Sequence, residues 1–255
     1  MKAIAVIPAR YGSSRFEGKP LADIMGKSMI RRVYEQVMQC KGVAGVWVAT
    51  DDERIAAHLE SFGARYCLTS PDLPNGTQRC YRAYADTIRP AIGEVDVIVN
   101  VQGDEPFIAP QAVETVVKAF EEGADKDIVT LVKRITEPEF LFDPNVVKAV
   151  RAKDGRALYF SRQAIPFQRD LAQTDAAAWL RTTPYFKHIG LYAYRSAVLA
   201  ELTALETGRL EKAESLEQLR WLENGYAIYG YETDYESVSV DRPEDIETLK
   251  KMWKL

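Results

Sequence analysis

The sequence predicts one α/β domain over residues 1–255, built on a mainly parallel sheet with helices on both faces and carrying a hairpin insertion. Short runs rich in Val and Ile alternate with segments of helical spacing, which is typical of strand–helix–strand units. The chain has 255 residues, of which 47% are hydrophobic, and α/β domains of this size commonly form a single core. No internal repeat, low-complexity stretch or linker indicates a second domain.

The first half alternates predicted strands and helices regularly. Strands are predicted at residues 3–8, 46–50, 95–101 and 128–133, and helices at 29–38, 53–62, 79–88 and 113–120. Right-handed crossovers between parallel strands place the loops that follow the strands at one edge of the sheet. We therefore expect the functional site after Ile7, Thr50 and Val101.

The second half is less regular. Residues 146–152 and 157–160 are predicted to form a hairpin with Gly155 in its turn, and this hairpin forms part of an insertion near 145–195. The other predicted elements are a loop at 171–183, a strand at 186–194, a helix at 215–223, strands at 227–232 and 237–240, and a last helix opened by Pro243.

Charge and cysteine content exclude several classes of protein. With 33 Lys+Arg against 37 Asp+Glu, the net charge of -4 provides no basic surplus for a nucleic-acid polymer. Cys40, Cys67 and Cys80 form no Cys-x-x-Cys pair, which argues against a disulfide framework or a cysteine zinc site. No apolar run has the length of a membrane span or a signal peptide. We expect a cytoplasmic protein without a membrane partner.

A cationic loop follows the first predicted strand. Arg10, Arg15 and Lys19 lie among small residues that include Gly12 and Gly18, a composition suited to binding a polyphosphate through side chains and backbone N–H groups. A solvated basic loop is an equally good interpretation of this segment alone. Five residues separate the glycines and Pro20 follows Lys19, so the loop is not a Walker motif.

An acidic motif ends the third predicted strand. Gly103-Asp104-Glu105 places carboxylates at the carboxyl edge of the sheet, where oxygen ligands can hold Mg²⁺ against phosphate oxygens. Alternatively, the two carboxylates could cap the helix that begins near Pro110. Because the cationic loop is expected at the same edge, metal binding is the favoured interpretation of Asp104.

The remaining polar motifs are less specific. Asp51-Asp52-Glu53 opens a helix, and capping together with the helix dipole explains acids there. Arg79 ends a turn ahead of another helix and could meet a base or a phosphate, or serve the fold. With two histidines a three-His zinc site is impossible, and a lone strand histidine such as His188 is usually structural.

Several motifs, taken in order, resemble one enzyme family. They are Ile7-Pro8-Ala9-Arg10-Tyr11, Ser14-Arg15, Gly18-Lys19-Pro20-Leu21, Val48-Ala49-Thr50-Asp51-Asp52, Gly76-Thr77, Asn100-Val101-Gln102-Gly103-Asp104-Glu105-Pro106, Ala157-Leu158-Tyr159-Phe160-Ser161-Arg162, His188-Ile189-Gly190-Leu191-Tyr192, Leu216-Glu217-Gln218-Leu219-Arg220 and Pro243-Glu244-Asp245. This pattern, from about residue 3 to about 250, is similar to that of the CMP-Kdo synthetases, the 3-deoxy-manno-octulosonate cytidylyltransferases.

The resemblance implies a Rossmann-like nucleotidyltransferase fold, a homodimer, and a reaction of CTP with the acidic eight-carbon sugar Kdo that yields CMP-Kdo and pyrophosphate for lipopolysaccharide biosynthesis. It implies Mg²⁺ held by Asp104 and Asp241, with Lys19 as a further catalytic residue. The nucleotide is expected to meet Arg10, Gly12, Ser13, Arg15, Lys19, Asn75, Thr77 and Arg79. The sugar is expected to meet Gln102, Arg162, His188, Tyr192, Glu217 and Gln218.

Two departures from the family pattern bear on specificity. Gln78 stands where the family usually has Asp or Glu, and Arg242 adds a cation next to Asp241. The alternatives are the same chemistry on 8-amino-Kdo or a sialic acid, a non-catalytic nucleotide-binding regulator, and a metal-free phosphosugar-binding scaffold. The regulator is disfavoured by the presence of both aspartates.

Overall fold

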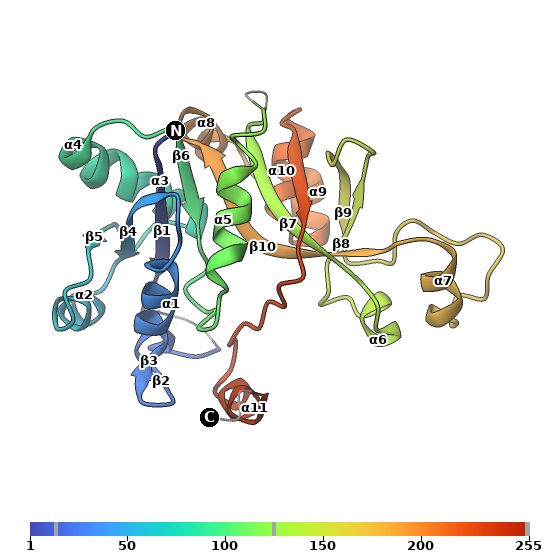
Figure 1. Ribbon diagram of the computed structural model, residues 1–255, viewed down its shortest axis with the longest axis horizontal. Coiled ribbons are helices and arrows are strands. Elements are labelled where there is room, and N and C mark those ends of the chain that lie inside the picture. Colours follow the sequence, from blue (N-terminus) through green and yellow to red (C-terminus); the bar gives the residue numbers. More distant parts are fainter. Residues whose placement is uncertain (13–14, 124–125, 253–255) are drawn as a thin grey trace.

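Nine strands form one mixed sheet in the computed structural model, which describes residues 1–12, 15–123 and 126–252. The order along its main path is β11-β7-β10-β6-β1-β4-β5, and β8 and β9 extend it beside β10 (Figure 1). The strands are β1 (Ala3–Ala9), β4 (Val43–Thr50), β5 (Tyr66–Leu68), β6 (Val97–Asn100), β7 (Ile128–Arg134), β8 (Lys148–Arg151), β9 (Ala157–Ser161), β10 (Phe186–Arg195) and β11 (Ile228–Glu232).

The sheet is mainly parallel, which confirms the predicted fold class. β1 pairs in parallel with both β4 and β6, β4 pairs in parallel with β5, and β7 does so with β11. β10 is the exception, because it runs antiparallel between β6 and β7. The carboxyl ends of β1 and β6 therefore lie side by side at one edge, as the alternation of elements predicts.

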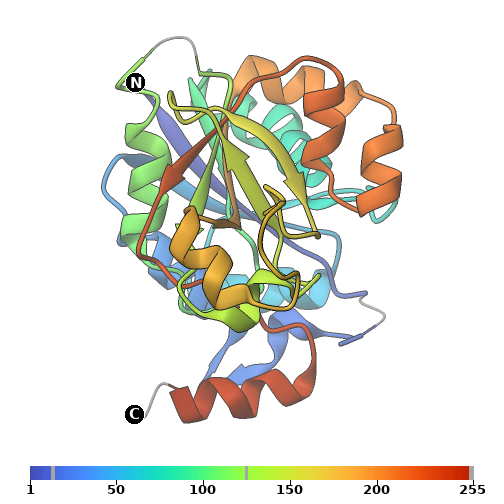
Figure 2. The ribbon, with the colours of Figure 1, turned by 90° about the vertical axis from the view of Figure 1, so that its right-hand side faces the viewer.

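Helices cover both faces of the sheet (Figure 2). Alternate residues of β1 point to opposite faces: Ala5 and Ile7 join one buried cluster, and Ile4 and Val6 join the other. The first cluster contains side chains of α1 (Met29–Val37), α2 (Glu53–Glu60) and α5 (Pro110–Lys118), and the second contains side chains of α3 (Gly76–Ala83), α8 (Ser196–Ala204) and α10 (Gln218–Glu223).

Further short helices connect these layers. They are η2 (Tyr84–Ile88) and α4 (Arg89–Ile92), which continue α3, together with α6 (Pro138–Leu141), α7 (Ala176–Thr182) and α9 (Arg209–Glu214). Among the helices of the described ranges, none has the length and apolar character needed to cross a membrane.

The predicted loop at 171–183 is wrong, because it contains α7. Trp179 is buried in this helix and stacks with Tyr185, with 6.2 Å between the ring centroids. Its indole N–H donates to the Ala172 carbonyl at 3.0 Å. The signals for this helix are local: Asp175 caps it by accepting from the Ala178 N–H at 2.8 Å, and the three alanines that follow Asp175 are strong helix formers.

The hairpin insertion forms as predicted from β8 and β9. β8 pairs antiparallel with both β9 and β10, which joins the hairpin to the main sheet. An isolated bridge between Arg156 and Tyr229 ties the turn of the hairpin to β11. The insertion is therefore an extension of the sheet and shares its second core.

The predicted strand at 237–240 is also wrong. After β11, residues 233–241 pair with no strand among the described residues and lead to α11 (Pro243–Met252), seen at the bottom of Figure 1. Val240 and Leu249 are buried there with Ile24 and Met29, which belong to the small hairpin of β2 (Asp23–Ile24) and β3 (Lys27–Ser28) and to the start of α1. This segment, called the strap below, carries Asp241 back to the edge of the sheet.

Candidate active site

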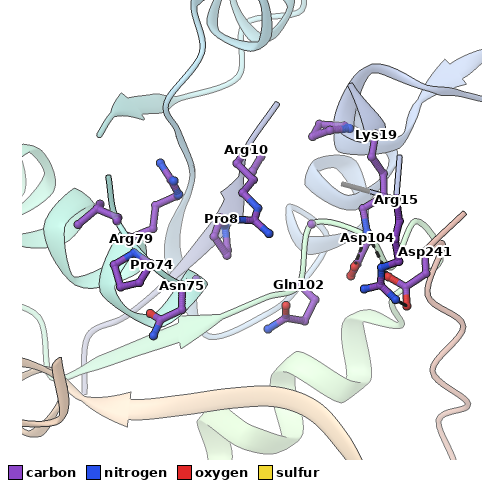
Figure 3. Close-up of a pocket in the computed structure, with 15 residues that line it drawn as sticks. Pro8, Arg10, Arg15, Lys19, Pro74, Asn75, Arg79, Gln102, Asp104 and Asp241 are labelled. Atoms are coloured by element: carbon purple, nitrogen blue, oxygen red, sulfur yellow. Dashed lines mark hydrogen bonds and ion pairs between the residues drawn. The ribbon is translucent and has the colours of Figure 1, made fainter. Parts of the chain in front are cut away.

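A pocket of about 350 Å³ opens at the carboxyl ends of β1 and β6. Figure 3 shows Arg15, Lys19, Asp104 and Asp241 at one end and Pro74, Asn75 and Arg79 at the other, with Arg10 and Gln102 between them. The structure thus brings together eight of the residues predicted from the sequence, which come from segments far apart in the chain. This arrangement favours a loop that binds a charged ligand over a basic loop that is only solvated.

Lys19 joins the two aspartates at the charged end of the pocket. Its Nζ donates to Asp104 Oδ2 at 2.8 Å and to the Val240 carbonyl at 2.9 Å, and it lies 3.6 Å from Asp241 Oδ1. Arg15 Nη1 approaches Asp241 Oδ2 from the other side at 3.4 Å. Asp104 and Asp241, 137 positions apart, therefore converge on one ammonium group.

A tight turn presents Lys19 to the pocket. Gly18 has φ +69°, a left-handed conformation that favours glycine, and its N–H donates to the Tyr11 carbonyl at 3.0 Å. Lys19 then begins the short helix η1 (Lys19–Leu21), with Pro20 buried behind it. The turn closes the cationic loop and holds its last cation beside β6.

The two aspartates fit a hard divalent cation that shares its shell with phosphate. Their side chains keep 26% and 43% of their surface exposed, so carboxylate oxygens face the pocket. Across the part of the chain that the structure describes, no group of three or more His, Cys, Asp or Glu side chains is close enough to hold a metal. Mg²⁺ is usually held by one or two carboxylates together with substrate phosphates, and this donor set matches that pattern.

Gly103 permits the close approach of the two strands that form the pocket floor. A Cβ at this position would lie 2.6 Å from the Pro8 carbonyl oxygen. Because this oxygen belongs to the backbone, no side-chain rotation can relieve the clash. The end of β1 and the loop after β6 can therefore stay in contact only while position 103 has no side chain.

We expect Gly103→Ala to lower the free energy of unfolding by about 1–3 kcal/mol, because the added methyl forces the loop after β6 away from β1. Chemical denaturation of the purified variant measures this effect. Gly190→Ala is the matched control, since a Cβ there meets nothing within 4 Å and the expected change is below about 0.5 kcal/mol. Equal losses in the two variants would contradict the assigned contact.

The other end of the pocket is built by the start of α3. The Asn75 side chain caps this helix by accepting from the Gln78 N–H at 2.8 Å, and its Nδ2 donates to Glu217 Oε1 at 2.9 Å. Thr77 Oγ1 donates to the other oxygen of Glu217, also at 2.9 Å. Burial raises the pKa of the Glu217 carboxyl above its ordinary value. Glu217 thus links α10 to the Asn75 end of the pocket.

Arg79 lines the pocket but directs its guanidinium to the protein. It is 3% exposed, and its Nη2 lies 2.8 Å from Asp51 Oδ2 while Nη1 donates to Thr69 Oγ1 at 2.7 Å. Asp52 caps α2 by accepting from the Arg54 N–H at 2.9 Å, which agrees with the structural interpretation of this acidic run. Nucleotide contact by Arg79 stays a prediction.

Of the six residues predicted for the sugar, only Gln102 belongs to the lining of the described pocket. Its Nε2 donates to the Gly190 carbonyl at 3.3 Å. Tyr192 and Gln218 are buried outside the pocket lining, and Tyr192 Oη and Gln218 Nε2 have no partner within the described part of the chain. Arg162 instead ties two loops together, donating to the Glu214 and Pro144 carbonyls at 2.7 and 2.9 Å.

His188 lies behind this region and is poorly suited to accept a proton. Its ring packs against Phe160 and Tyr192, at centroid distances of 5.1 and 5.3 Å, and its Nε2 lies 3.0 Å from Thr130 Oγ1. Burial lowers the pKa of His188 to about 3. The imidazole is therefore neutral near pH 7 and is available for hydrogen bonding rather than general-base work.

Not every predicted nucleotide residue can be placed at the pocket. Gly12 and Thr77 do not belong to its lining, and Ser13 lies outside the described residues. Sequence reasoning also missed the separate role of Glu105. This residue is 4% exposed and turned away from the pocket, and burial raises the pKa of its carboxyl. The only signal for it in the sequence is its place beside Asp104.

A family model described as Cytidylyltransferase matches residues 4–246. The chain is 48% identical over 243 residues to a 3-deoxy-manno-octulosonate cytidylyltransferase of Cytophaga hutchinsonii, covering 95% of this chain and 94% of the relative. It is also 45% identical over 247 residues to an 8-amino-3,8-dideoxy-manno-octulosonate cytidylyltransferase of a Shewanella species, covering 96% of each.

Solved structures show the same fold. CMP:2-keto-3-deoxy-manno-octonic acid synthetase complexed with CTP superposes with a TM-score of 0.89 at 39% identity, covering 100% of this chain and 99% of that one. A glucose-1-phosphate thymidylyltransferase of Bacillus anthracis, described as putative, superposes at 0.62 with 14% identity, covering 98% and 94% of the two chains. At that identity the likeness extends to the fold alone.

Proposed function

This chain belongs to the 3-deoxy-manno-octulosonate cytidylyltransferase family, and from that premise we propose that its pocket joins the CMP group of CTP to Kdo and releases pyrophosphate. The observation that carries this proposal is the convergence of Asp104, Asp241 and Lys19 at one end of a pocket whose other end is the Asn75 turn. The two ends are lined by different side chains, which suits a nucleotide whose base and triphosphate need different surroundings.

The triphosphate lies with the cations of the first loop. Arg10, Arg15 and Lys19 line one stretch of the pocket, and their donors would neutralise the charge that grows on the leaving pyrophosphate. Nucleotidyl transfer further requires the sugar hydroxyl to lie in line with the α-phosphorus. Gln102, between the two ends, is placed to orient the sugar.

We assign Mg²⁺ to Asp104 and Asp241, whose paired carboxylates supply hard oxygen ligands beside the phosphate-binding cations. When bound there, the ion would neutralise phosphate charge and lower the pKa of the sugar hydroxyl. Lys19 holds both carboxylates near one point before any ligand arrives, so these side chains need little rearrangement. Neutral His188 has no proton-accepting role in this scheme.

Pyrophosphate release with CTP, Mg²⁺ and a panel of acidic sugars tests the proposed function. We expect turnover with Kdo, and the panel includes 8-amino-Kdo and a sialic acid because a relative with 45% identity is named for the 8-amino sugar. An ammonium at C8 would need a carboxylate near the sugar. Preference for 8-amino-Kdo would show that the chain acts on the other sugar used in this family. No reaction with any sugar would refute the proposed activity.

We expect CTP to be used at least about tenfold better than UTP, because the wrong base leaves a buried polar group of the pocket unpaired. The Asn75 turn and the backbone beside Ala9 line the end assigned to the base. Competition between CTP and UTP in the same pyrophosphate assay measures the preference. Comparable rates would show that Gln78, where the family usually has an acid, relaxes base selection.

We expect Lys19→Ala to lower kcat/KM for CTP roughly 10- to 150-fold. This corresponds to about 1.5–3 kcal/mol of lost transition-state stabilisation, from the charge-assisted contacts that Lys19 makes to phosphate. The thermal midpoint should change little, because Lys19 makes its contacts at the pocket and not in the core. Lys27→Ala, which removes an exposed ion pair with Glu35, is the control. Unchanged steady-state kinetics in Lys19→Ala would remove this residue from the site.

We assign the product of the reaction to lipopolysaccharide biosynthesis and the enzyme to the cytoplasm.

We further propose that the chain forms a homodimer through the insertion near 145–195. Three large apolar side chains are exposed in and beside this region, namely Phe142, Leu158 and Phe167. Phe142 and Phe167 pack edge-on against Trp179, so one aromatic group extends from the core to the surface. Light scattering of the purified chain tests the assembly, and a monomer at micromolar concentration would contradict it.

A further inference from the structure

The strap, residues 233–241, carries half of the assigned metal site yet pairs with no strand in the part of the chain that the structure describes. Its backbone is held at the far end: the Val240 N–H donates to the Asp104 carbonyl at 2.9 Å, and the Val240 carbonyl accepts from Lys19 Nζ at 2.9 Å. Asp241 follows directly. The position of its carboxylate therefore depends on whatever fixes the strap beside residues 104–105.

Glu105 makes two hydrogen bonds to the strap. Its Oε2 accepts from Tyr235 Oη at 2.9 Å, and its Oε1 accepts from Ser237 Oγ at 2.6 Å. Tyr235 and Ser237 are two positions apart, so on an extended segment their side chains point to the same side. Both oxygens of one buried carboxylate thus face consecutive same-side residues of the strap.

Other contacts also hold the strap: Asp245 Oδ2 accepts from the Asp241 N–H at 2.8 Å, and Lys19 and Arg15 approach the Asp241 carboxylate. Glu236, between the two hydroxyl residues, forms ion pairs with Lys133 and Lys187 of β7 and β10. Val238 and Val240 pack with the apolar cluster beneath α11. Apolar packing has little directional preference, whereas two hydrogen bonds to one rigid carboxylate fix both distance and register.

We propose that Glu105 is a positioning residue, which sets the Asp241 carboxylate opposite Asp104 by anchoring the strap through Tyr235 and Ser237. The inference rests on the proposed function, since it gives Asp241 a catalytic purpose. Glu105 follows Asp104, the other metal ligand, directly in the chain. The hydrogen bonds of Glu105 therefore hold the strap at a fixed position relative to Asp104. Small displacements of a reacting group lower turnover steeply, which is why such an anchor matters.

The double variant Tyr235→Phe/Ser237→Ala removes both hydroxyls and leaves the apolar contacts of the strap. We expect kcat at saturating CTP and sugar to fall at least about tenfold while KM for CTP changes less than about threefold, because the cations of the first loop remain. Hydrogen exchange followed by mass spectrometry should show faster exchange in peptides that contain Val240 and unchanged exchange in β1 and β6. Tyr226→Phe removes a similar bond of 2.8 Å to Glu201 and should change neither measurement.

Glu105→Gln is the second variant, in case loss of both hydroxyls leaves too little folded protein. It keeps the side-chain volume and one accepting oxygen, so its exchange and kcat should lie between those of the wild type and of Glu105→Ala. Faster exchange with unchanged kcat would overturn the positioning role, and unchanged exchange would overturn the anchor itself. Failure of the proposed function differs from both, because the wild type would then release no pyrophosphate.

Discussion

Asp241→Asn is expected to lower kcat about a thousandfold while CTP affinity changes little, the largest catalytic effect that the structure predicts. Asparagine keeps the size and one oxygen but removes the charge that a hard divalent ion requires. The Asp241 side chain is 43% exposed, so the substitution should change the free energy of unfolding little. Arg10, Arg15 and Lys19 still hold the triphosphate, and the loss is therefore felt mainly in the transition state.

Asp104→Asn should behave in the same way, since both carboxylates approach the same ammonium of Lys19. If they act as one unit, the double variant is little worse than either single variant. Asp234→Asn, on the exposed part of the same strap, is the matched control and should keep full activity. Strictly additive losses, or full activity in Asp241→Asn, would refute the shared metal site.

Arg79→Met should lower the free energy of unfolding by about 3–5 kcal/mol, because it leaves the Asp51 carboxylate with no charged partner in a poorly solvated site. Urea denaturation measures this loss. Adding Asp51→Asn should recover part of the stability, since the unpaired charge is then removed. The result would establish whether Arg79 primarily serves the fold.

Arg82→Met provides a matched control one turn further along. Arg82 pairs with Asp86 at the same distance of 2.8 Å, but both side chains are about half exposed, and such a pair contributes less than about 1 kcal/mol. An unchanged unfolding free energy in Arg79→Met, together with a raised KM for CTP, would instead identify Arg79 as a nucleotide ligand.

Sequence reasoning succeeds where local pattern and function coincide. The apolar runs that became β1 and β6 are buried on both faces, so their composition alone identifies them, and parallel pairing then places Arg10 and Asp104 at one edge. Lys19 could be assigned to the same edge because it follows the first strand closely. The fold class and the location of the pocket required no knowledge of long-range contacts.

It fails where distant partners decide the outcome. Residues 237–240 have the composition of a strand, yet Glu105 and Asp104 hold this segment by hydrogen bonds. Glu105 is 132 positions away from its partner Ser237. The helix at Ala176–Thr182 is a different kind of failure, because its alanines and its Asp175 cap are local signals that the predicted loop overlooked. Arg79 looks like a ligand residue by its turn, and only the position of Asp51 shows where its charge is directed.

The antiparallel placement of β10 has a consequence for how the chain folds. β6 and β7 are both complete by Arg134, but each pairs with β10, which begins at Phe186. During synthesis the middle of the sheet therefore stays open while about 50 further residues emerge, which takes roughly 3–10 s at ordinary elongation rates. Two buried strands with unpaired edges are exposed to other chains throughout that interval. Closure by β10 is thus the slow, non-local step that we expect to govern refolding yield and the demand for chaperones.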